Sequence, residues 1–426
     1  MRIIIDIIFV FFTTYIMIKS LKSIIKYESH SLFDFAILML YLVQCFPVLC
    51  DLVFGYPEYA VYLSEFERAL NNNIVALIYN IYISAAMFVL YFFSRHKVKT
   101  SKSQETERQI EDPESYMIPN FMLIILAVLP LVHILLSGNI MYYVIYGSAT
   151  QRGVSRDFSE DNMILVVIAI AALMIWYFRK NESILRTIAF VFLLFLNFWA
   201  GGKRYIVATA FFCFIYMFST RRKSSKKKQV KLFLIIAALS CGIVVFSSIY
   251  LVGTRGISES WSNLYTTLRI DFGRDDVVKY TILHEFIDNE SILEYPGQTV
   301  IGTLLMIVPR SIFPAKPYPH YRYLTASIYD MSILEIPSGM TPTFLEMSIS
   351  NFGILGFIIA IAFVTWYCYV ADKETNSTRK FLYAIVMLGF MTQSLDSMWP
   401  LFYLVLFFLL TRNVRFTIHG KGIRFR

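Results

Sequence analysis

Long, uninterrupted apolar runs are the feature that most constrains this sequence. Crossing about 30 Å of hydrocarbon takes roughly 20 apolar residues as helix, and the backbone polar groups of each crossing must be satisfied within the element itself. The chain is 57% hydrophobic and only 16% charged, so lipid solvates most of it. The sequence therefore predicts an all-α polytopic membrane protein.

Eleven apolar runs are candidate membrane spans. The last two are short and are separated only by residues 395–397, so one broken or re-entrant segment is an alternative to two helices. The first run follows a single positive residue and lacks a cleavage site, which favours a retained span over a removed signal peptide. The runs cover residues 3–18, 32–54, 74–93, 119–136, 162–178, 184–200, 204–219, 231–252, 353–371, 380–394 and 398–411.

Basic residues are distributed unevenly between the loops, and cytoplasmic loops carry the excess of Lys and Arg. The strongest basic run is RRKSSKKK at residues 221–228. Placing it inside puts most other basic loops inside too. We therefore expect the N-terminus outside and the C-terminus in the cytoplasm. Merging the last two runs would move the basic tail outside, which the same bias disfavours.

One connection on the external side is large. Residues 253–352 separate a bundle of eight spans (1–252) from the C-terminal spans and cytoplasmic tail (353–426). A hundred residues is long for a structureless connection, so a small folded cap or a functional lid is expected. This large extracytoplasmic loop is where we expect the chemistry.

The charge balance and the cysteines exclude several classes of protein. The net charge is +9, but the loop at 253–352 holds eleven acidic residues against seven basic ones, so no nucleic-acid-binding surface is expected. All five cysteines lie inside apolar runs, where packing is the expected role and neither a disulfide framework nor a zinc site is predicted. We expect no metal and no other cofactor.

Cations on the external side oppose the general bias, so each one requires an explanation. Arg204 ends the run GGKR at residues 201–204, and Arg255 lies in GTRG at residues 253–256. Glycines beside an arginine allow close approach of a ligand to the backbone. The alternative is a cation that extends to the lipid headgroups, and this alternative is stronger for Lys203.

A proline-rich stretch carries two further cations. Arg310 and Lys316 lie in PRSIFPAKP at residues 309–317, where prolines would hold the two charges at a fixed separation. The planar fork of arginine suits bidentate contacts with phosphate oxygens. A phosphate or pyrophosphate at the outer membrane face is therefore a natural ligand.

Three tyrosines follow this stretch closely. Tyr318, Tyr321 and Tyr323 combine apolar faces with polar tips, which suits stacking on sugar rings. Packing within the cap or in the interfacial aromatic belt is the alternative for each of them.

Acid–base candidates in the loop are His320, His284, Glu346 and the pair Asp275 and Asp276. His320 follows the two cations closely and can accept a proton near neutral pH, while Glu346 lies just before a span. No third ligand stands near the aspartate pair at a recognisable spacing, so we expect those two side chains to be solvated.

Four motifs in this order resemble the oligosaccharide repeat-unit polymerases of the Wzy type, which build bacterial O-antigens and capsules. They are GGKR at 201–204, GTRG at 253–256, PRxxxPxKP at 309–317 and ExxxxNFGxxG at 346–356. The resemblance implies a C-type glycosyltransferase-like fold in the cytoplasmic (inner) membrane. It also implies undecaprenyl-pyrophosphate-linked glycans as donor and acceptor, membrane lipids as surroundings, and a chain-length regulator as a further partner.

The resemblance also implies roles for individual residues. Related O-antigen ligases use a histidine in the large external loop, which makes His320 the candidate base, with Glu346 as its rival. Pyrophosphate binding is implied for four cations: Arg204, Arg255, Arg310 and Lys316.

Two other activities remain open at this point. An O-antigen ligase would transfer finished glycan to a lipid acceptor, and a flippase or transporter for lipid-linked sugars would use a cationic cavity without bond chemistry. Transporters commonly show evenly spaced spans and internal repeats, which the lopsided large loop disfavours.

Overall fold

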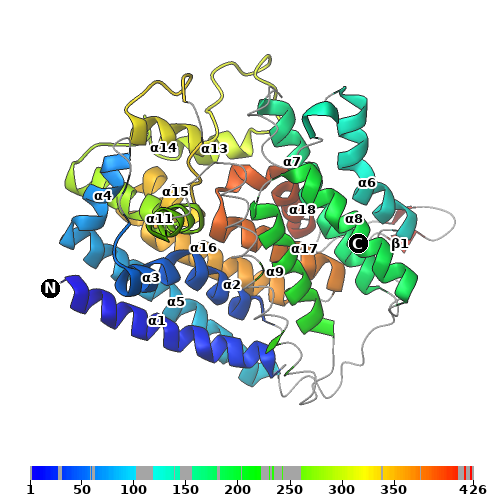
Figure 1. The fold of residues 1–426 in the computed structure, drawn as a ribbon, viewed down its shortest axis with the longest axis horizontal. Coiled ribbons are helices and arrows are strands. Elements are labelled where there is room, and N and C mark those ends of the chain that lie inside the picture. The colour runs from blue at the N-terminus through cyan, green and yellow to red at the C-terminus, as the bar shows by residue number, and fades with distance from the viewer. Residues whose placement is uncertain are drawn as a thin grey trace.

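The computed structural model places most of the chain in helices (Figure 1). It describes residues 2–26, 31–57, 59, 63–101, 119–138, 140–143, 156–179, 183–202, 204–221, 230, 233–234, 242, 261–336, 339–374, 376–410, 417–418 and 423–424. The elements are α1 (Arg2–Ile25), α2 (Leu32–Leu40), the π-helical turn η1 (Tyr41–Cys45), α3 (Phe46–Phe54), α4 (Ser64–Asn71), α5 (Asn73–Ser101), α6 (Asn120–Leu136), the 3₁₀ turn η3 (Ile140–Tyr143), α7 (Arg156–Phe178), α8 (Ile184–Gly201), α9 (Arg204–Arg221), α11 (Trp261–Phe272), α12 (Asp275–Ile282), the π-helical turn η5 (Leu283–Ile287), α13 (Gln298–Leu304), α14 (His320–Tyr329), α15 (Phe344–Phe352), α16 (Ile354–Asp372), α17 (Ser377–Thr392), the 3₁₀ turn η6 (Leu395–Met398), α18 (Trp399–Leu410), and the antiparallel pair β1 (Thr417–Ile418) and β2 (Ile423–Arg424).

Among the described residues, six helical segments are long and apolar enough to cross a membrane, which confirms the prediction of a helical chain built on apolar spans. Two shorter apolar helices, Asn120–Leu136 and Ile206–Thr220, coincide with further predicted runs. The total of eleven spans stays a prediction, and the run at 231–252 lies almost entirely outside the described residues. The six segments are Arg2–Ile25, Leu32–Phe54, Asn73–His96, Asp161–Phe178, Ile184–Gly201 and Ile354–Asp372.

The last two predicted runs form two helices, α17 and α18, with the 3₁₀ turn η6 between them. Gln393 ends α17 in an extended conformation. The α-helix is thus interrupted at residues 395–397, where the sequence separates the two apolar runs. Whether the two helices are separate spans or one re-entrant segment stays open.

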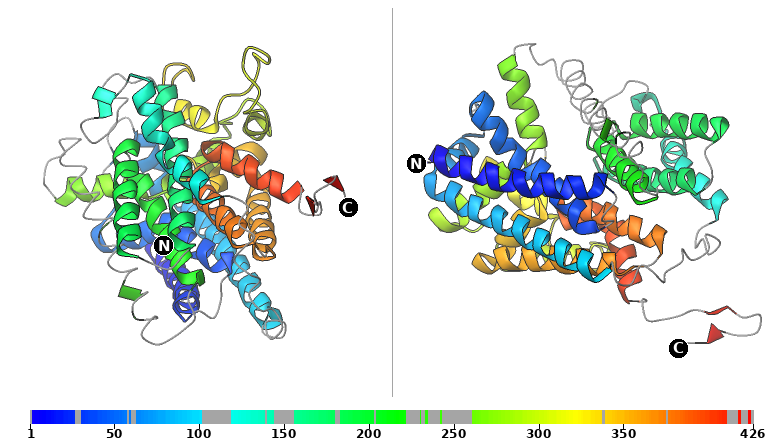
Figure 2. Two further views of the ribbon diagram at one scale, coloured as in Figure 1. Left: turned by 90° about the vertical axis from the view of Figure 1, so that its right-hand side faces the viewer. Right: turned by 90° about the horizontal axis from the view of Figure 1, so that it is seen from below.

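The described helices pack in two groups (Figure 2). Helices α6, α7, α8 and α9 pack on one another, while α1 to α5 and α11 to α18 form the larger group. The two groups meet where α9 packs against α17. Aromatic rings join them there: Phe35 lies edge-on against Phe212 and Tyr216, and Tyr216 contacts Phe381.

Connections predicted on one side of the membrane lie together. On the predicted external side, Arg68 of α4 forms an ion pair with Asp288. On the predicted cytoplasmic side, Arg95 donates to the carbonyl of Lys19, and the backbone N–H of Leu32 donates to Asp372. The pairing of loops agrees with the predicted alternation, and the absolute orientation of the termini stays a prediction.

A proline links the second span to the large loop. Pro47 has no N–H, so the carbonyl of Val43, four residues earlier, lacks its helical partner, and the chain forms the π-helical turn η1 just before Pro47. The backbone N–H of Arg274 donates to that same carbonyl at 2.8 Å. The irregularity in the span therefore supplies an anchor for the segment at 261–282.

The large loop contributes to the core as well as to the surface. All eight residues of α12 are buried, and this helix packs against α4, α5 and α15. The loop therefore includes a core helix around which the candidate site is built, rather than a cap alone. The boundaries 1–252, 253–352 and 353–426 themselves stay predictions.

Two glycines of the ExxxxNFGxxG motif shape the junction of α15 and α16. Gly353 has φ +55° and ψ −132°, a conformation that side chains oppose. A Cβ at Gly356 would overlap the carbonyl of Ser348 and the Cα of Ile349. The sharp turn therefore needs both glycines.

We expect Gly356→Ala to destabilise this junction. The added methyl has no space, and overpacking of this kind costs about 1–3 kcal/mol. Thermal unfolding in detergent should show a lower midpoint for Gly356→Ala, while Leu355→Ala, at an exposed neighbouring position, should melt close to the wild type. Equal midpoints for Gly356→Ala and the wild type would contradict the close contact.

Candidate functional site

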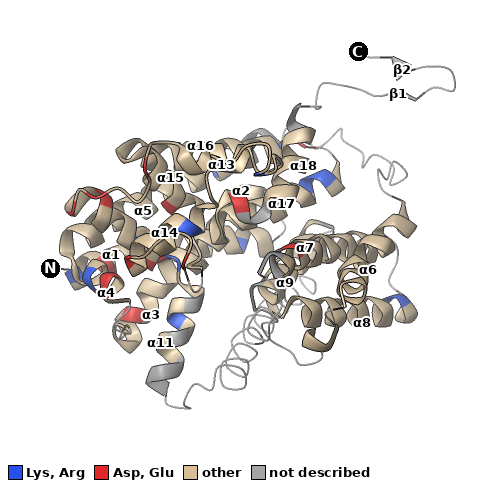
Figure 3. Cartoon of the chain, turned by 90° about the horizontal axis from the view of Figure 1, so that it is seen from above, with Lys and Arg blue, Asp and Glu red and all other residues tan. Residues whose placement is uncertain are grey.

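Three groups of polar side chains lie on, or in contact with, the part of the chain that begins with α11. Figure 3 shows few charged residues along the apolar helices and several near α4, α11 and α14. The three groups are a cluster of cations around Tyr318, a buried pair formed by His320 and Glu346, and a buried ion network centred on Arg269.

Arg310 and Lys316 face one another across the turn between α13 and α14. The guanidinium of Arg310 stacks on the ring of Tyr318 at 3.8 Å from the centroid and donates to the carbonyls of Lys316 and Pro317. Lys316 Nζ donates to the carbonyl of Val308 at 2.8 Å. These backbone hydrogen bonds fix the directions of both side chains but do not neutralise their charges.

Arg322 completes this group, which we call the cation cluster (Arg310, Lys316, Arg322 and Tyr318). Its guanidinium carbon lies 5.3 Å from the centroid of Tyr318. In the part of the chain that the structure describes, none of the three cations forms an ion pair with a carboxylate. Arg322 was missed from the sequence, although its place two residues after His320 was a usable signal.

Lys316 and Arg310 repel each other within the cation cluster. Burial lowers the pKa of Lys316, and the nearby charge of Arg310 lowers it further. A bound anion would relieve this repulsion. The cluster is therefore suited to bind a phosphate or pyrophosphate group.

His320 and Glu346, the two predicted base candidates, lie in direct contact. His320 Nε2 is 2.9 Å from Glu346 Oε1 and 3.0 Å from Oε2, and both side chains have no exposed surface. Burial lowers the pKa of His320, but the carboxylate of Glu346 outweighs this and raises it above the ordinary value. The paired, charged form of the imidazole is favoured.

A shell of hydrogen bonds fixes the pair. His320 Nδ1 lies 3.1 Å from Thr299 Oγ1, and Asn351 Nδ2 donates to that hydroxyl. Glu346 Oε1 accepts from Ser350 at 2.8 Å. These contacts tie the start of α14 to α13 and α15.

Asp396, in the turn between α17 and α18, caps α14 by accepting from the backbone N–H of His320 at 2.8 Å. A carboxylate at a helix N-terminus also interacts favourably with the positive end of the helix dipole. The turn at 395–398 and the large loop thus meet, as expected if both lie on one side of the membrane.

Access is the physical difficulty for a catalytic role of the pair. Both ring nitrogens of His320 are engaged, and neither side chain reaches the surface. As placed, the pair positions α14, and with it Arg322. The roles of His320 and Glu346 as base stay predictions.

The three tyrosines occupy different surroundings. Tyr318 is half-buried beneath the guanidinium of Arg310, and Tyr321 is half-buried. Tyr323 is buried, and its hydroxyl accepts from Gln298 and from the backbone N–H of Tyr318. The packing role weighed for these residues applies to Tyr323, and sugar binding stays a prediction for all three.

Asp275 and Asp276 are buried, so the expectation of a solvated pair was wrong. Arg269 forms a bidentate contact with Asp51, with both N–O distances at 2.8 Å. The same guanidinium reaches Asp275 at 2.7 Å and Asp276 at 3.3 Å. The counter-charge that keeps these carboxylates in the core comes from Arg269, which lies six residues before Asp275 and also pairs with the distant Asp51.

The pKa values of the two aspartates shift in opposite directions. Burial raises the pKa of Asp276 to about 6, with Asp275 adding to the shift and Arg269 opposing it. Burial also acts on Asp275, but Arg269 and Lys279 outweigh it and lower its pKa. Lys279 lies 2.7 Å from Asp275, one helical turn away, and this (i, i+4) spacing was visible in the sequence.

Two of the predicted pyrophosphate ligands cannot be placed. Arg255 lies outside the described residues, as does Lys203, and of Arg204 only the main chain, at the start of α9, is described. Their roles stay predictions. The structure therefore brings together Arg310 and Lys316 of the four cations.

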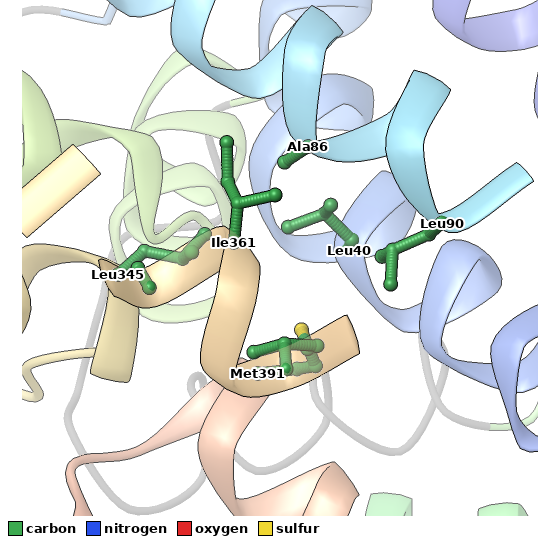
Figure 4. Close-up of a pocket in the computed structure, with 8 residues that line it drawn as sticks. Leu40, Ala86, Leu90, Leu345, Ile361 and Met391 are labelled. Atoms are coloured by element: carbon green, nitrogen blue, oxygen red, sulfur yellow. The ribbon is translucent and has the colours of Figure 1, made fainter. Parts of the chain in front are cut away.

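The cavity shown in Figure 4 is apolar and belongs to the helix core. It lies between α2, α5, α15, α16 and α17 and is lined by Leu40, Ala86, Leu90, Leu345, Ala360, Ile361, Val364 and Met391. It contains no group that could perform chemistry. Among the described residues, no group of three His, Cys, Asp or Glu side chains could hold a metal ion.

No protein-family model, curated protein or solved structure matches the chain. A functional proposal for this chain therefore rests on its residues and their geometry.

From the Arg269 network we expect opposite effects on the unfolding midpoint when each of two adjacent carboxylates is replaced. Asp275→Asn should lower the unfolding midpoint in detergent at neutral pH, because it removes the carboxylate that contacts Lys279. Breaking a buried pair costs about 3–5 kcal/mol. Asp276→Asn should leave the midpoint unchanged or higher, because it removes the carboxylate whose ionised form burial disfavours. The reverse order of the two midpoints would contradict this reading of the network.

The pair of His320 and Glu346 predicts a pH-dependent stability. Because the folded-state pKa of His320 lies above 6.5, its contribution is present in full below about pH 6.5 and is lost as the pH rises through the folded-state pKa. The difference in unfolding midpoint between wild type and His320→Gln should therefore be larger near pH 6 than near pH 9. In a Glu346→Gln background this pH dependence should disappear, and an equal difference at both pH values would contradict the pairing.

Proposed function

We propose that this protein is a membrane glycosyltransferase that polymerises undecaprenyl-pyrophosphate-linked oligosaccharide repeat units into O-antigen or capsular polysaccharide. It would work at the outer face of the cytoplasmic membrane, with eleven spans in a C-type glycosyltransferase-like arrangement. The observation that carries the proposal is the cation cluster: Arg310 and Arg322 lie over Tyr318, Lys316 lies close enough to Arg310 to feel its charge, and none of the three pairs with a carboxylate in the described part of the chain.

The chemistry places charge where this cluster could neutralise it. A hydroxyl of the acceptor glycan attacks the anomeric carbon of the donor, a new C–O bond forms, and the bond to the pyrophosphate oxygen breaks. Negative charge develops on the departing lipid pyrophosphate. Preorganised cations stabilise such charge without reorganising during the reaction, and pyrophosphate leaves readily without a general acid.

Arginine geometry supports the choice of ligand. Arg310 is held by Tyr318 and two carbonyls, so its orientation is set before a ligand arrives. A planar guanidinium makes two parallel hydrogen bonds to phosphate oxygens, and Lys316 adds a point charge beside it. In this proposal Arg204 and Arg255 are further ligands of the pyrophosphate.

The proton of the attacking hydroxyl goes to a base, and the candidates remain His320 and Glu346. Because both are buried, a base role requires the turn between α13 and α14 to move away from α15. In the described conformation the pair supports the reaction by fixing α14, which carries Arg322.

We expect Arg310→Ala and Arg322→Ala each to lower the elongation rate of a lipid-linked repeat unit by purified protein by roughly 100-fold, the effect of removing one group that stabilises transition-state charge. Arg310→Lys should restore activity only in part, because lysine lacks the fork. Arg68→Ala is the matched control, since Arg68 already pairs with Asp288 and Glu65 and should keep activity.

The same assay separates the alternatives. Elongation in detergent would exclude a purely transporting role, and transfer only to a final lipid acceptor without elongation would indicate a ligase. Wild-type rates for both alanine variants in folded protein would show that the cation cluster does not bind the leaving group.

A further inference from the structure

The turn between α13 and α14 carries an unusual group of exposed apolar side chains. Ile312 is 73% exposed and Leu304 is 54% exposed, and Ile301, Ile307 and Phe313 are exposed as well. Several exposed apolar side chains within one short segment are unfavourable in water, and such a patch commonly marks a contact with another surface. We call residues 301–317, which comprise the end of α13 and the turn that follows it, the α13–α14 turn.

The backbone of this turn is capped by side chains. Tyr403 donates to the carbonyls of Thr303 and Leu304, at 3.0 and 2.6 Å. Lys316 Nζ donates to the carbonyl of Val308, and Arg310 donates to those of Lys316 and Pro317. Irregular backbone is tolerated near lipid only where its polar groups are satisfied by protein. The capping therefore suits surroundings with little water.

The anchor of the turn lies on an apolar helix. Tyr403 belongs to α18, whose sequence WPLFYLVLFFLL holds no charged residue and which exposes Phe407. Tryptophan and tyrosine concentrate where a membrane meets water. The α13–α14 turn is thus held beside the end of a helix whose composition suits lipid.

The charges and the apolar side chains of the α13–α14 turn together complement a lipid surface. The cation cluster lies next to the exposed apolar side chains, and its cations have no carboxylate partner in the described segments. Apolar side chains that enter a bilayer beside cations that meet lipid phosphates are the pattern of an interfacial element. A protein partner would have to supply both an apolar face and unpaired acidic groups.

We propose that the α13–α14 turn inserts into the membrane–water interface, with Leu304, Ile307 and Ile312 among the acyl chains and the cation cluster at the level of the lipid phosphates. This inference does not rest on the proposed polymerase activity. It gives the cluster a fixed depth, at which phosphate groups of membrane lipids are its nearest ligands.

Spin labels on the full chain in lipid nanodiscs test the depth of the turn. Labels at Leu304→Cys and Ile312→Cys should collide more with oxygen than with a water-soluble nickel chelate, as should one at Ile358→Cys on the exposed face of α16. A label at Ser291→Cys, exposed in the same loop, should show the opposite preference. The wild-type protein, labelled in the same way, supplies the background from its native cysteines.

Two outcomes would overturn the insertion. Labels at 304 and 312 that prefer the chelate, as at 291, would place the turn in water. Labels protected from both reagents would indicate cover by a second copy or another protein.

Lipid composition tests the role of the cations. Replacing part of the phosphatidylcholine by phosphatidylglycerol should increase the depth at Ile312→Cys, and Arg310→Gln with Arg322→Gln should remove that increase. The same increase produced by inorganic phosphate with phosphatidylcholine alone would show a site for free phosphate and overturn the lipid assignment. Elongation assays are independent of these measurements, so a failure here is distinguishable from a failure of the proposed activity.

Discussion

The bidentate contact between Arg269 and Asp51 is the interaction on which the large loop depends. It joins the end of α11 to α3, with neither side chain exposed by more than a few per cent. Removing charges from water is costly unless they are paired and hydrogen-bonded. The surrounding residues supply this: Tyr265 donates to Asp51, and Asp275 bridges Arg269 and Lys279. The network fixes α12 inside the helical core.

Once α12 is fixed, the position of the remaining polar groups follows. Helix α12 packs on α15, and Thr281 of α12 donates to Glu346 of α15. Glu346 in turn holds His320 at the start of α14, and α14 carries Arg322. Buried polar contacts, together with the helices α12 and α14, therefore connect the second span to the cation cluster. Rigid support of this kind is what a site needs to hold charges in a fixed geometry.

The class of the protein could be predicted from the sequence, but most contacts in the site could not. Apolar runs of the required length predict helices because the backbone polar groups must be satisfied within the element in lipid, and the described part of the chain contains six such segments. Arg310, Lys316 and Tyr318 could be grouped because they are neighbours in sequence. Asp51 and Arg269 are 218 residues apart, and no local pattern connects them.

The error over Asp275 and Asp276 has a different origin. Two adjacent carboxylates are usually solvated, but Arg269, six residues before Asp275, contacts both of them inside the core. The contact of His320 with Glu346 was likewise hidden, although each residue was singled out separately. Local sequence indicated which residues were unusual, whereas tertiary packing determined which of them met.

The distance along the chain between Asp51 and Arg269 has a consequence for biogenesis. At about 5–20 residues per second, the ribosome adds the 218 residues from position 52 to Arg269 in a time on the order of 10 to 40 s. Throughout that interval the nascent second span carries a carboxylate without its guanidinium. Asp51 lies three residues from the end of α3, where water at the membrane surface can solvate it until its partner is synthesised. For spans that insert in chain order, the bilayer therefore receives Asp51 before the internal counter-ion of this carboxylate, 218 residues further along the chain, has been synthesised.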